Sequence, residues 1–217
     1  FVMFRGREMV YELLESCCGA RLTVSYVRIG GLAADVPDDF VPRCRALVKN
    51  LRDLIVQGER LMTRNEIIIR RFRDVGVMPA DEALSWGWVG PCLRGSGVPY
   101  DVRKDHPYSG YEQYDFDVPV GTVGDCYDRY LVRLEEIRQS LRIIDQALAK
   151  LLGGPIIVDD KKVALPPKAD VYSNIESLMN HFKLVYEGIL PPKGEVYGYT
   201  EGANGELGYY IVSDGKK

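Results

Sequence analysis

The stretch DCYDRYLVRLEEIRQSLRIIDQALAKLL, from Asp125 to Leu152, carries the clearest structural pattern in this chain. Its apolar residues recur at alternating spacings of four and three, and they are Tyr130, Leu134, Ile137, Leu141, Ile144, Leu148 and Leu151. This spacing places them on one face of a long helix, which has to pack along other helices. Gly153-Gly154-Pro155 then ends the helix. The stretch therefore predicts a mainly helical fold.

Shorter helices are expected on the N-terminal side of this stretch. Apolar spacing and capping signals predict them over residues 7–17, 38–62, 66–73 and 79–86. Pro42 would fall in the first turn of the second helix, where a missing N–H costs least. Residues 20–37 are expected to form a short extended or irregular piece that ends in a turn at Gly30-Gly31.

A small β element is expected near the C-terminus. Residues 195–200 and 207–213 alternate around Asn204-Gly205, which predicts a hairpin. Residues 114–118 alternate apolar and acidic and predict another brief strand. Between these pieces, the residues from Ser173 to Glu176 resemble a capping box that opens a helix through Glu187. We therefore expect one α+β domain over residues 1–217, mainly α with a small β-hairpin element.

Composition excludes several classes of protein. Hydrophobic residues make up 46% and charged residues 27%, as in an ordinary globular protein. The net charge is −3 and the charges are mixed along the chain, which argues against a nucleic-acid partner because phosphate binding needs a basic stripe. No apolar run approaches the length of about 18 residues that a spanning helix needs. Contact with a membrane is therefore expected only through partner subunits.

Metal and disulfide chemistry also have little support. The five cysteines (Cys17, Cys18, Cys44, Cys92 and Cys126) show no CxxC spacing, and free, buried thiols are the expected state. The two histidines, His106 and His181, are far apart in sequence. No nucleophile elbow, HExxH, P-loop or GxGxxG motif occurs, so no catalytic constellation is predicted from motifs.

The segment RGSGVPYDVRKDHPYSGY, residues 94–111, is unusual for a loop. It combines turn residues with three arginine or lysine side chains and three tyrosines. Such composition is typical of a segment that docks a partner or positions a ligand. His106 within it has two interpretations, a proton-transfer group or, the more common case, a hydrogen-bonding surface group.

Other charged and aromatic residues also leave alternatives open. Arginines recur along the long helix, where they fit an anionic partner or, as we favour, intrahelical ion pairs with Glu135, Glu136 and Asp145. These arginines are Arg129, Arg133, Arg138 and Arg142. Asp115 and Asp117 share a strand face that suits a cation, although a solvated face is more common. The tryptophans at positions 86 and 88 are expected to anchor a core or an interface.

Five long motifs in order resemble one known family. They are GARLTVSYVRIGGLAADVP (19–37), GPCLRGSGVPYDVRKDHPYSGYEQYDFDVPVG (90–121), GDCYDRYLVRLEEIRQSLRII (124–144), HFKLVYEGILPPKGEVY (181–197) and GELGYYIVSDG (205–215). Together they resemble the 49 kDa subunit of respiratory complex I, the large catalytic-core subunit of NADH-quinone oxidoreductase. The resemblance extends over essentially the whole chain, which is expected to be an internal portion of that subunit.

The family is similar in turn to the large subunit of nickel–iron hydrogenases, which implies a hydrogenase-like helical bundle. The skeleton from Gly76 to Arg103 and the GELGYY hairpin resemble both groups. Hydrogenase large subunits hold their metals with a CxxC pair near each end, and this chain has neither pair. The resemblance therefore favours the quinone enzyme and implies no metal and no directly bound cofactor here.

The resemblance also implies partners and a site. In complex I this subunit lies in the peripheral arm, on the cytoplasmic side of the bacterial inner membrane or the mitochondrial matrix side. It faces a small subunit that carries the terminal 4Fe–4S cluster, and quinone enters the cavity between the two. The matching residues flank that cavity: Phe1 and Phe4 in the family's aromatic segment, and Arg21 in its loop near the cluster.

One position in that loop departs from the family pattern. Many members carry a histidine where Thr23 stands, and that histidine is held to tune the protonation-linked potential of the cluster. Threonine has no titratable ring, so this tuning is expected to be weaker here or supplied elsewhere.

Two other functions remain open from the sequence. The chain could belong to a related energy-converting hydrogenase-type complex, or it could be a purely structural scaffold that docks neighbouring subunits. Flanking sequence would distinguish the hydrogenase-type complex from the quinone enzyme, because CxxC pairs favour a hydrogenase and an upstream HPxTHG favours the quinone enzyme.

Overall fold

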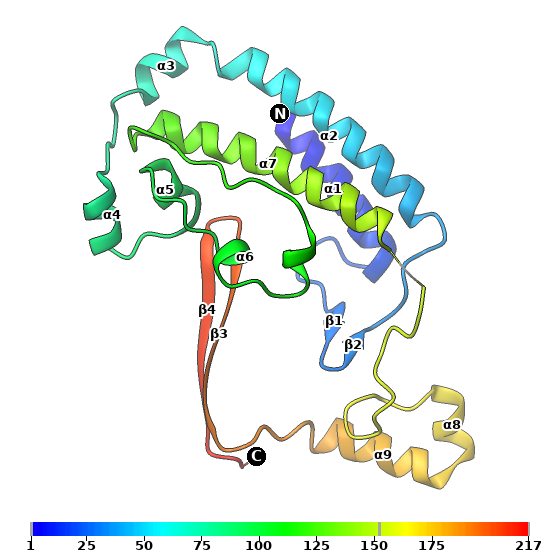
Figure 1. The fold of residues 1–217 in the computed structure, drawn as a ribbon. Helices are drawn as coiled ribbons and strands as arrows, with labels where there is room; N and C mark the ends of the chain where they lie inside the picture. The colour runs from blue at the N-terminus through cyan, green and yellow to red at the C-terminus, as the bar shows by residue number, and fades with distance from the viewer. Residues whose placement is uncertain (1, 152, 217) are drawn as a thin grey trace. The chain divides into compact units, whose positions relative to one another are not determined.

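A computed structural model describes residues 2–151 and 153–216, and helices account for about half of the chain (Figure 1). The helices are α1 (Val2–Cys18), α2 (Phe40–Met62), α3 (Glu66–Phe72), α4 (Ala80–Ser85), α5 (Gly90–Gly95), α6 (Val102–Asp105), α7 (Cys126–Ala149), α8 (Lys168–Ser173) and α9 (Ile175–Tyr186). The strands are β1 (Val27–Arg28), β2 (Gly31–Leu32), β3 (Gly194–Gly202) and β4 (Gly205–Ser213), paired β1 with β2 and β3 with β4. The predicted mainly α fold with a small β element is confirmed.

Contacts group the described residues into two compact units. The first contains residues 2–10, 41–151 and 198–209, and the second contains residues 11–40, 153–197 and 210–216. Helix α1 and the β3–β4 hairpin each continue from one unit into the other. The expectation of a single domain over residues 1–217 stays a prediction.

Helices α2 and α7 supply the core of the first unit. Val48 and Ile55 of α2 form one buried cluster with Leu141 of α7, and partly buried leucine and isoleucine side chains pack around it. Leu134 and Leu148 are buried on the same face of α7. The apolar stripe read from the sequence therefore marks the buried face of this helix, as predicted.

Helix α1 begins five residues before the predicted start at Arg7. Gly6 explains why the helix extends, because a Cβ at this position would lie 2.8 Å from Cδ2 of Leu51 in α2. Packing between the two helices at this close approach stabilises the first turns of α1. A local sequence pattern does not reveal such packing. At its other end the predicted stop is confirmed, since Gly19 has a φ of 71° and its N–H donates to the carbonyl of Glu15 at 2.8 Å.

Glycines also let the hairpin tip approach helix α5. Gly90 begins α5 with a φ of 65°, and a Cβ there would lie 2.6 Å from the backbone nitrogen of Gly205. Gly205 follows the tip of the hairpin with a φ of 127°, and a Cβ there would lie 2.6 Å from Cγ2 of Val89. Neither position tolerates a side chain without movement of the backbone, so both glycines are required for this contact.

The predicted strand at residues 114–118 is wrong. The segment is extended and Phe116 is buried, but its backbone pairs with side chains of α7 instead of another strand. The Gln146 amide accepts from the N–H of Asp115 at 2.9 Å and donates to its carbonyl at 2.7 Å. The Gln139 carbonyl oxygen accepts from the N–H of Asp117 at 3.1 Å. A helix therefore satisfies the backbone groups that a neighbouring strand would otherwise satisfy.

The predicted capping box at Ser173 is also displaced by one residue. Asn174 is the N-cap of α9, and its side-chain oxygen accepts from the N–H of Glu176 at 2.9 Å. Ser173 instead closes α8, a short helix that the sequence did not indicate, and its hydroxyl donates to the carbonyl of Ala169 at 3.0 Å. Asparagine and serine are comparable caps, so local preference alone did not separate them.

Most predicted intrahelical ion pairs of α7 are replaced by pairs with other segments. Arg138 does pair with Glu135 at 3.0 Å, but it also contacts Glu59 of α2. Arg142 pairs with both Asp115 and Asp117, whose side chains are 75% and 78% exposed, so the interpretation of these aspartates as a solvated face is confirmed.

Further sequence expectations have mixed outcomes. All five cysteines are free as expected, although only Cys44 is buried. Trp86 is 72% exposed and is no core residue. No helix among the described residues combines the length and the apolar character that crossing a bilayer requires.

Candidate functional site

Arg94, at the end of α5, belongs to the charged segment 94–111, but its side chain points into the interior of the first unit. Its guanidinium is almost completely buried and bonds to three other segments of the first unit. Nε and Nη2 donate to Oε1 of Glu136 in α7 at 2.8 and 2.5 Å, and Nη1 and Nη2 donate to Oε1 of Glu201 in β3 at 3.0 Å each. Nη1 also donates to the carbonyl of Tyr100 at 2.8 Å. One side chain thus joins α5, α7 and the hairpin.

Asp101 and Arg103 form a second pair beside Arg94. Asp101 is the N-cap of α6 and accepts from the N–H of Arg103 at 2.9 Å and from its guanidinium at 3.0 and 2.7 Å. Burial by itself would raise the pKa of Asp101, but the hydrogen bonds and charge of Arg103 outweigh burial and lower this pKa. Asp101 is therefore ionised and tightly held.

Glu201 lies near the end of β3, and the effects on its pKa differ in balance from those on the pKa of Asp101. Its Oε2 accepts from the N–H of Val102 at 3.3 Å, and its own N–H donates to the hydroxyl of Tyr108 at 3.0 Å. Burial raises the pKa of Glu201, Arg94 opposes the rise, and the negative charge of Asp101 adds to it. The net effect is a raised pKa, so this carboxyl group keeps its proton to higher pH than an exposed glutamate does.

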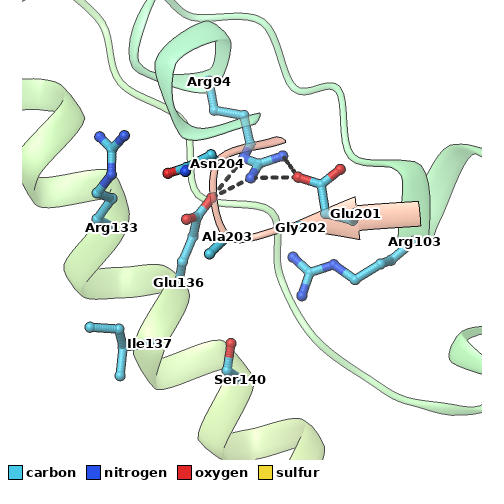
Figure 2. A pocket seen from close by; sticks show the side chains of 10 residues that line it. All are labelled: Arg94, Arg103, Arg133, Glu136, Ile137, Ser140, Glu201, Gly202, Ala203 and Asn204. Atoms are coloured by element: carbon cyan, nitrogen blue, oxygen red, sulfur yellow. Dashed lines mark hydrogen bonds and ion pairs between the residues drawn. The ribbon is translucent and has the colours of Figure 1, made fainter. Parts of the chain in front are cut away.

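These groups surround a cavity of about 450 Å³ between α5, α7 and the hairpin tip (Figure 2). Figure 2 shows Arg94, Glu136 and Glu201 meeting at one wall, with Arg103 beside them. The residues that line the cavity are Arg94, Arg103, Arg133, Glu136, Ile137, Ser140, Glu201, Gly202, Ala203 and Asn204. Seven of these ten residues have charged or polar side chains, which places charged and hydrogen-bonding groups around the cavity.

Metal chemistry has no support in the described part of the chain. No group of three or more histidine, cysteine, aspartate or glutamate side chains among residues 2–151 and 153–216 is placed to hold a metal ion. His106 is exposed at the C-cap of α6, where its ring makes an edge contact with Tyr199 at 5.9 Å between centroids. This position agrees with the surface interpretation of His106 and gives it no acid or base partner.

Phe4, Arg21 and Thr23, which the sequence predicts to flank a quinone cavity, are not among the residues that line this cavity. Phe1 is outside the described residues. Phe4 belongs to the first unit, where its ring is 63% exposed on α1 and the guanidinium carbon of Arg7 lies 6.0 Å from its centroid.

Arg21 and Thr23 belong to the second unit, in the bend that follows α1. Arg21 pairs with Glu15 at 3.4 Å, and its guanidinium carbon lies 5.5 Å from the ring centroid of Tyr11. Thr23 is exposed and has a φ of 55°, while its hydroxyl donates to the carbonyl of Leu22 at 2.6 Å. A β-branched residue in the left-handed region is strained, and histidine adopts that region more readily.

Two members of the site, Glu136 and Glu201, are not indicated by the sequence. The pattern of the long helix places Glu136 on its exposed face, and Glu201 has no special pattern around it. The fold brings Glu201 to Arg94 across 107 positions of sequence, and no local signal predicts such a contact.

Comparison with known proteins agrees with the resemblance seen in the sequence. The family model of the respiratory-chain NADH dehydrogenase 49 kDa subunit matches residues 1–217. An NADH-quinone oxidoreductase subunit from Bdellovibrio bacteriovorus is 54% identical over 215 residues, 99% of this chain and 38% of that protein. The corresponding subunit from Myxococcus xanthus is 51% identical over 210 residues, 97% of this chain and 51% of that protein.

A third relative gives the same result. An NADH-quinone oxidoreductase subunit from Methylacidiphilum infernorum is 49% identical over 212 residues, 98% of this chain and 51% of that protein. The chain thus spans about half the length, or less, of the curated relatives it matches. Because the family model matches the whole chain, this protein belongs to the family of the 49 kDa subunit of respiratory-chain NADH dehydrogenase.

Proposed function

We propose that this chain is part of an NADH:quinone oxidoreductase and forms one wall of its quinone-reduction cavity. The cavity lies next to the terminal 4Fe–4S cluster of a partner subunit, and electrons pass from NADH through that cluster to quinone, coupled to proton translocation. The chain itself binds no metal or cofactor in this proposal, and quinone is the substrate. Its contribution is to shape the cavity and to hold its walls in place.

The match of the family model to residues 1–217 is the observation that carries this proposal. Relatives at 49–54% identity are named as NADH-quinone oxidoreductase subunits, which makes the other subunits of that complex the expected partners. The peripheral arm of the membrane complex is the proposed location, on the cytoplasmic side of a bacterial inner membrane or on the matrix side in mitochondria. Partner subunits would then provide the contact with the membrane.

Exposed apolar side chains near the proposed flank agree with a surface that other subunits or quinone would cover. In the first unit, Met3 and Phe4 are exposed on α1. In the second unit, the segment after α1 exposes Leu22, Val27 and Ile29. Phe1, Phe4, Arg21 and Thr23 are the proposed flank residues, and an aromatic ring beside a few polar groups suits a quinone headgroup and tail.

Photolabelling of the intact complex with a quinone analogue tests the cavity-wall proposal. We expect labelling within residues 1–26 that excess unlabelled quinone suppresses. Labelling that avoids this segment would support the alternative in which the chain is only a structural scaffold.

A pair of matched substitutions makes the same test kinetically. Phe4 and Phe182 are phenylalanines of similar exposure, 63% and 58%, on different helices. We expect Phe4→Ala to raise the KM for quinone about three- to tenfold, since an aromatic contact contributes about 1 kcal/mol. Phe182→Ala should leave this KM unchanged, and NADH oxidation with an acceptor that bypasses the quinone cavity should be unaffected in both. Equal effects of the two substitutions would contradict the assignment of Phe4.

Thr23 offers a test of the proposed neighbourhood of the cluster. Thr23→His would place a titratable ring at this position, and its left-handed backbone accommodates histidine more easily than threonine. We expect the midpoint potential of the terminal cluster to become more dependent on pH between about pH 6 and 8, measured by redox titration with paramagnetic resonance. A potential with unchanged pH dependence would place Thr23 away from the cluster.

A further inference from the structure

The buried carboxyl groups of the charge cluster outnumber its guanidinium groups. Three carboxyl groups are nearly or fully buried, with side-chain exposures of 0% for Asp101, 4% for Glu201 and 15% for Glu136. Two guanidinium groups face them, Arg94 at 1% exposure and Arg103 at 14%. If every group were ionised, the cluster would carry one excess negative charge on side chains that are largely buried.

An unpaired buried charge is costly, and a carboxylate relieves that cost by binding a proton. Asp101 does not take the proton, because Arg103 holds its ionised form with three hydrogen bonds. Glu136 and Glu201 therefore compete for the single guanidinium of Arg94. Glu136 has the shorter contacts with Arg94 and is the more exposed of the two, so its ionised form is better stabilised.

The other charged and titratable groups near Glu201 do not remove this excess. From α6, Asp105 accepts from the N–H of Asp101 at 2.9 Å and adds negative charge. From the hairpin, Glu206 accepts from the hydroxyl of Tyr100 at 2.9 Å, a contact that together with burial raises the pKa of Tyr100 to about 12. The hydroxyl of Tyr108 accepts from the backbone N–H of Glu201 and adds no cation.

Arg133 on α7 is the one cavity-lining cation, among the residues the structure describes, that is not already part of the cluster. Its guanidinium is exposed and donates to the carbonyl of Arg129 at 3.3 Å and to Sγ of Cys92 at 3.7 Å. It has no carboxylate partner within the described ranges, and water screens its charge across the cavity. Arg133 therefore compensates the buried excess only weakly.

We propose that Glu201 is a proton-binding site, because it is the carboxyl group that the two guanidinium groups of the cluster leave without full compensation, and that it exchanges its proton through the cavity lined by Glu201 and Glu136. The cavity of about 450 Å³ gives water access to this carboxyl group. The inference goes beyond the proposed function and does not depend on it.

Infrared spectroscopy of the intact complex, recorded from about pH 5 to pH 8, tests the proposal directly. A protonated carboxylic acid has a carbonyl-stretch band that a carboxylate lacks. We expect a component of this band in the wild-type complex to persist above the pH range in which an exposed glutamate ionises, and we expect Glu201→Gln to remove that component. Glu66→Gln, a substitution at an exposed carboxylate that pairs only with Arg70 on its own helix, should leave the band unchanged.

Glu136→Gln provides a second test that does not alter Glu201. Removing one negative charge from the cluster should move the pH midpoint of the band down by on the order of one to two units. Arg133→Gln should move it up slightly or leave it in place. Absence from the wild-type complex of a band component that titrates above the range of an exposed glutamate, or persistence of that component in Glu201→Gln, would overturn the proposal. Appearance of the band only in Arg133→Gln would show instead that Arg133 balances the cluster.

Discussion

Replacing Arg94 by leucine should loosen the contact between α5, α7 and the hairpin more than any exposed substitution does. The change removes five hydrogen bonds and leaves the carboxylates of Glu136 and Glu201 without a common partner. Removal of one partner of a buried ion pair costs about 3–5 kcal/mol, because the remaining charge stays buried without compensation. Typical domains have a total stability of about 5–15 kcal/mol, so the loss would be large.

Hydrogen–deuterium exchange of the intact complex measures this loss locally. A destabilisation of about 3–5 kcal/mol corresponds to roughly 10²- to 10⁴-fold faster amide exchange in residues 198–209 and 100–106, if these open as a unit. Arg133→Leu is the matched control, since Arg133 lines the same cavity but is exposed and has no carboxylate partner in the described residues. We expect it to change local stability by no more than about 0.5 kcal/mol.

A triple variant distinguishes the cost of leaving charges unpaired from the cost of the lost packing. Adding Glu136→Gln and Glu201→Gln to Arg94→Leu removes both carboxyl groups that have lost their partner, so the triple variant should recover at least half of the lost protection. Two results would refute the reasoning. Exchange in Arg94→Leu at the wild-type rate would mean that the guanidinium does not hold the hairpin. A triple variant as unprotected as the single one would mean that packing, and not charge, sets the cost.

Three further predictions concern the backbone around this site and the second unit, each read by exchange in the intact complex. Gly90→Ala should destabilise the hairpin tip by about 1–3 kcal/mol, because the new Cβ meets the backbone of Gly205 at a positive φ. Asn174→Ala should cost α9 about 1 kcal/mol through loss of its N-cap, and an unchanged helix would contradict the assigned cap. Gln146→Leu should expose the amide of Asp115 to exchange, because a helix side chain and no strand protects it; continued protection would imply another partner.

Two controls sharpen these predictions. Gly198→Ala lies on the same hairpin as the Gly90 contact but meets nothing within 4 Å, so it should cost little. Ser173→Ala changes the residue that the sequence pattern indicated as the cap, and it should affect α9 less than Asn174→Ala does. A larger effect of Ser173→Ala would restore the capping box predicted from the sequence.

The helices could be predicted because their signal is local. The recurring apolar positions of α7 depend only on helix geometry, and Leu141 lies in the core as that geometry requires. The same holds for the glycine that ends α1 and for the turn of the hairpin. The segment 114–118 shows the limit of this reasoning. Its alternation correctly placed Phe116 inside, but the same alternation fits any extended segment, and the partner turned out to be two glutamine side chains.

The charge cluster could not be predicted for a different reason. Local rules pair an arginine with carboxylates three or four positions away, and along α7 that rule was correct for Arg138 and Glu135. Arg94 is buried and Arg142 is partly exposed, and both pair with carboxylates far away in sequence that the fold brings near them. Composition identified residues 94–111 as unusual and suggested docking or ligand positioning, but it did not indicate that Arg94, Asp101 and Arg103 face inward.

The glycines and the ion pairs of this region depend on each other. Glu201 reaches Arg94 only if the hairpin tip approaches the start of α5, and the tip approaches only because Gly90 and Gly205 carry no side chains. The backbone contact alone contributes little stability, since glycine packs few atoms and loses more conformational freedom than other residues on folding. The buried guanidinium alone would be destabilising, since it needs carboxylates from both α7 and β3 to offset the loss of water. The two features are therefore stable only together, and a change in either one should release the other.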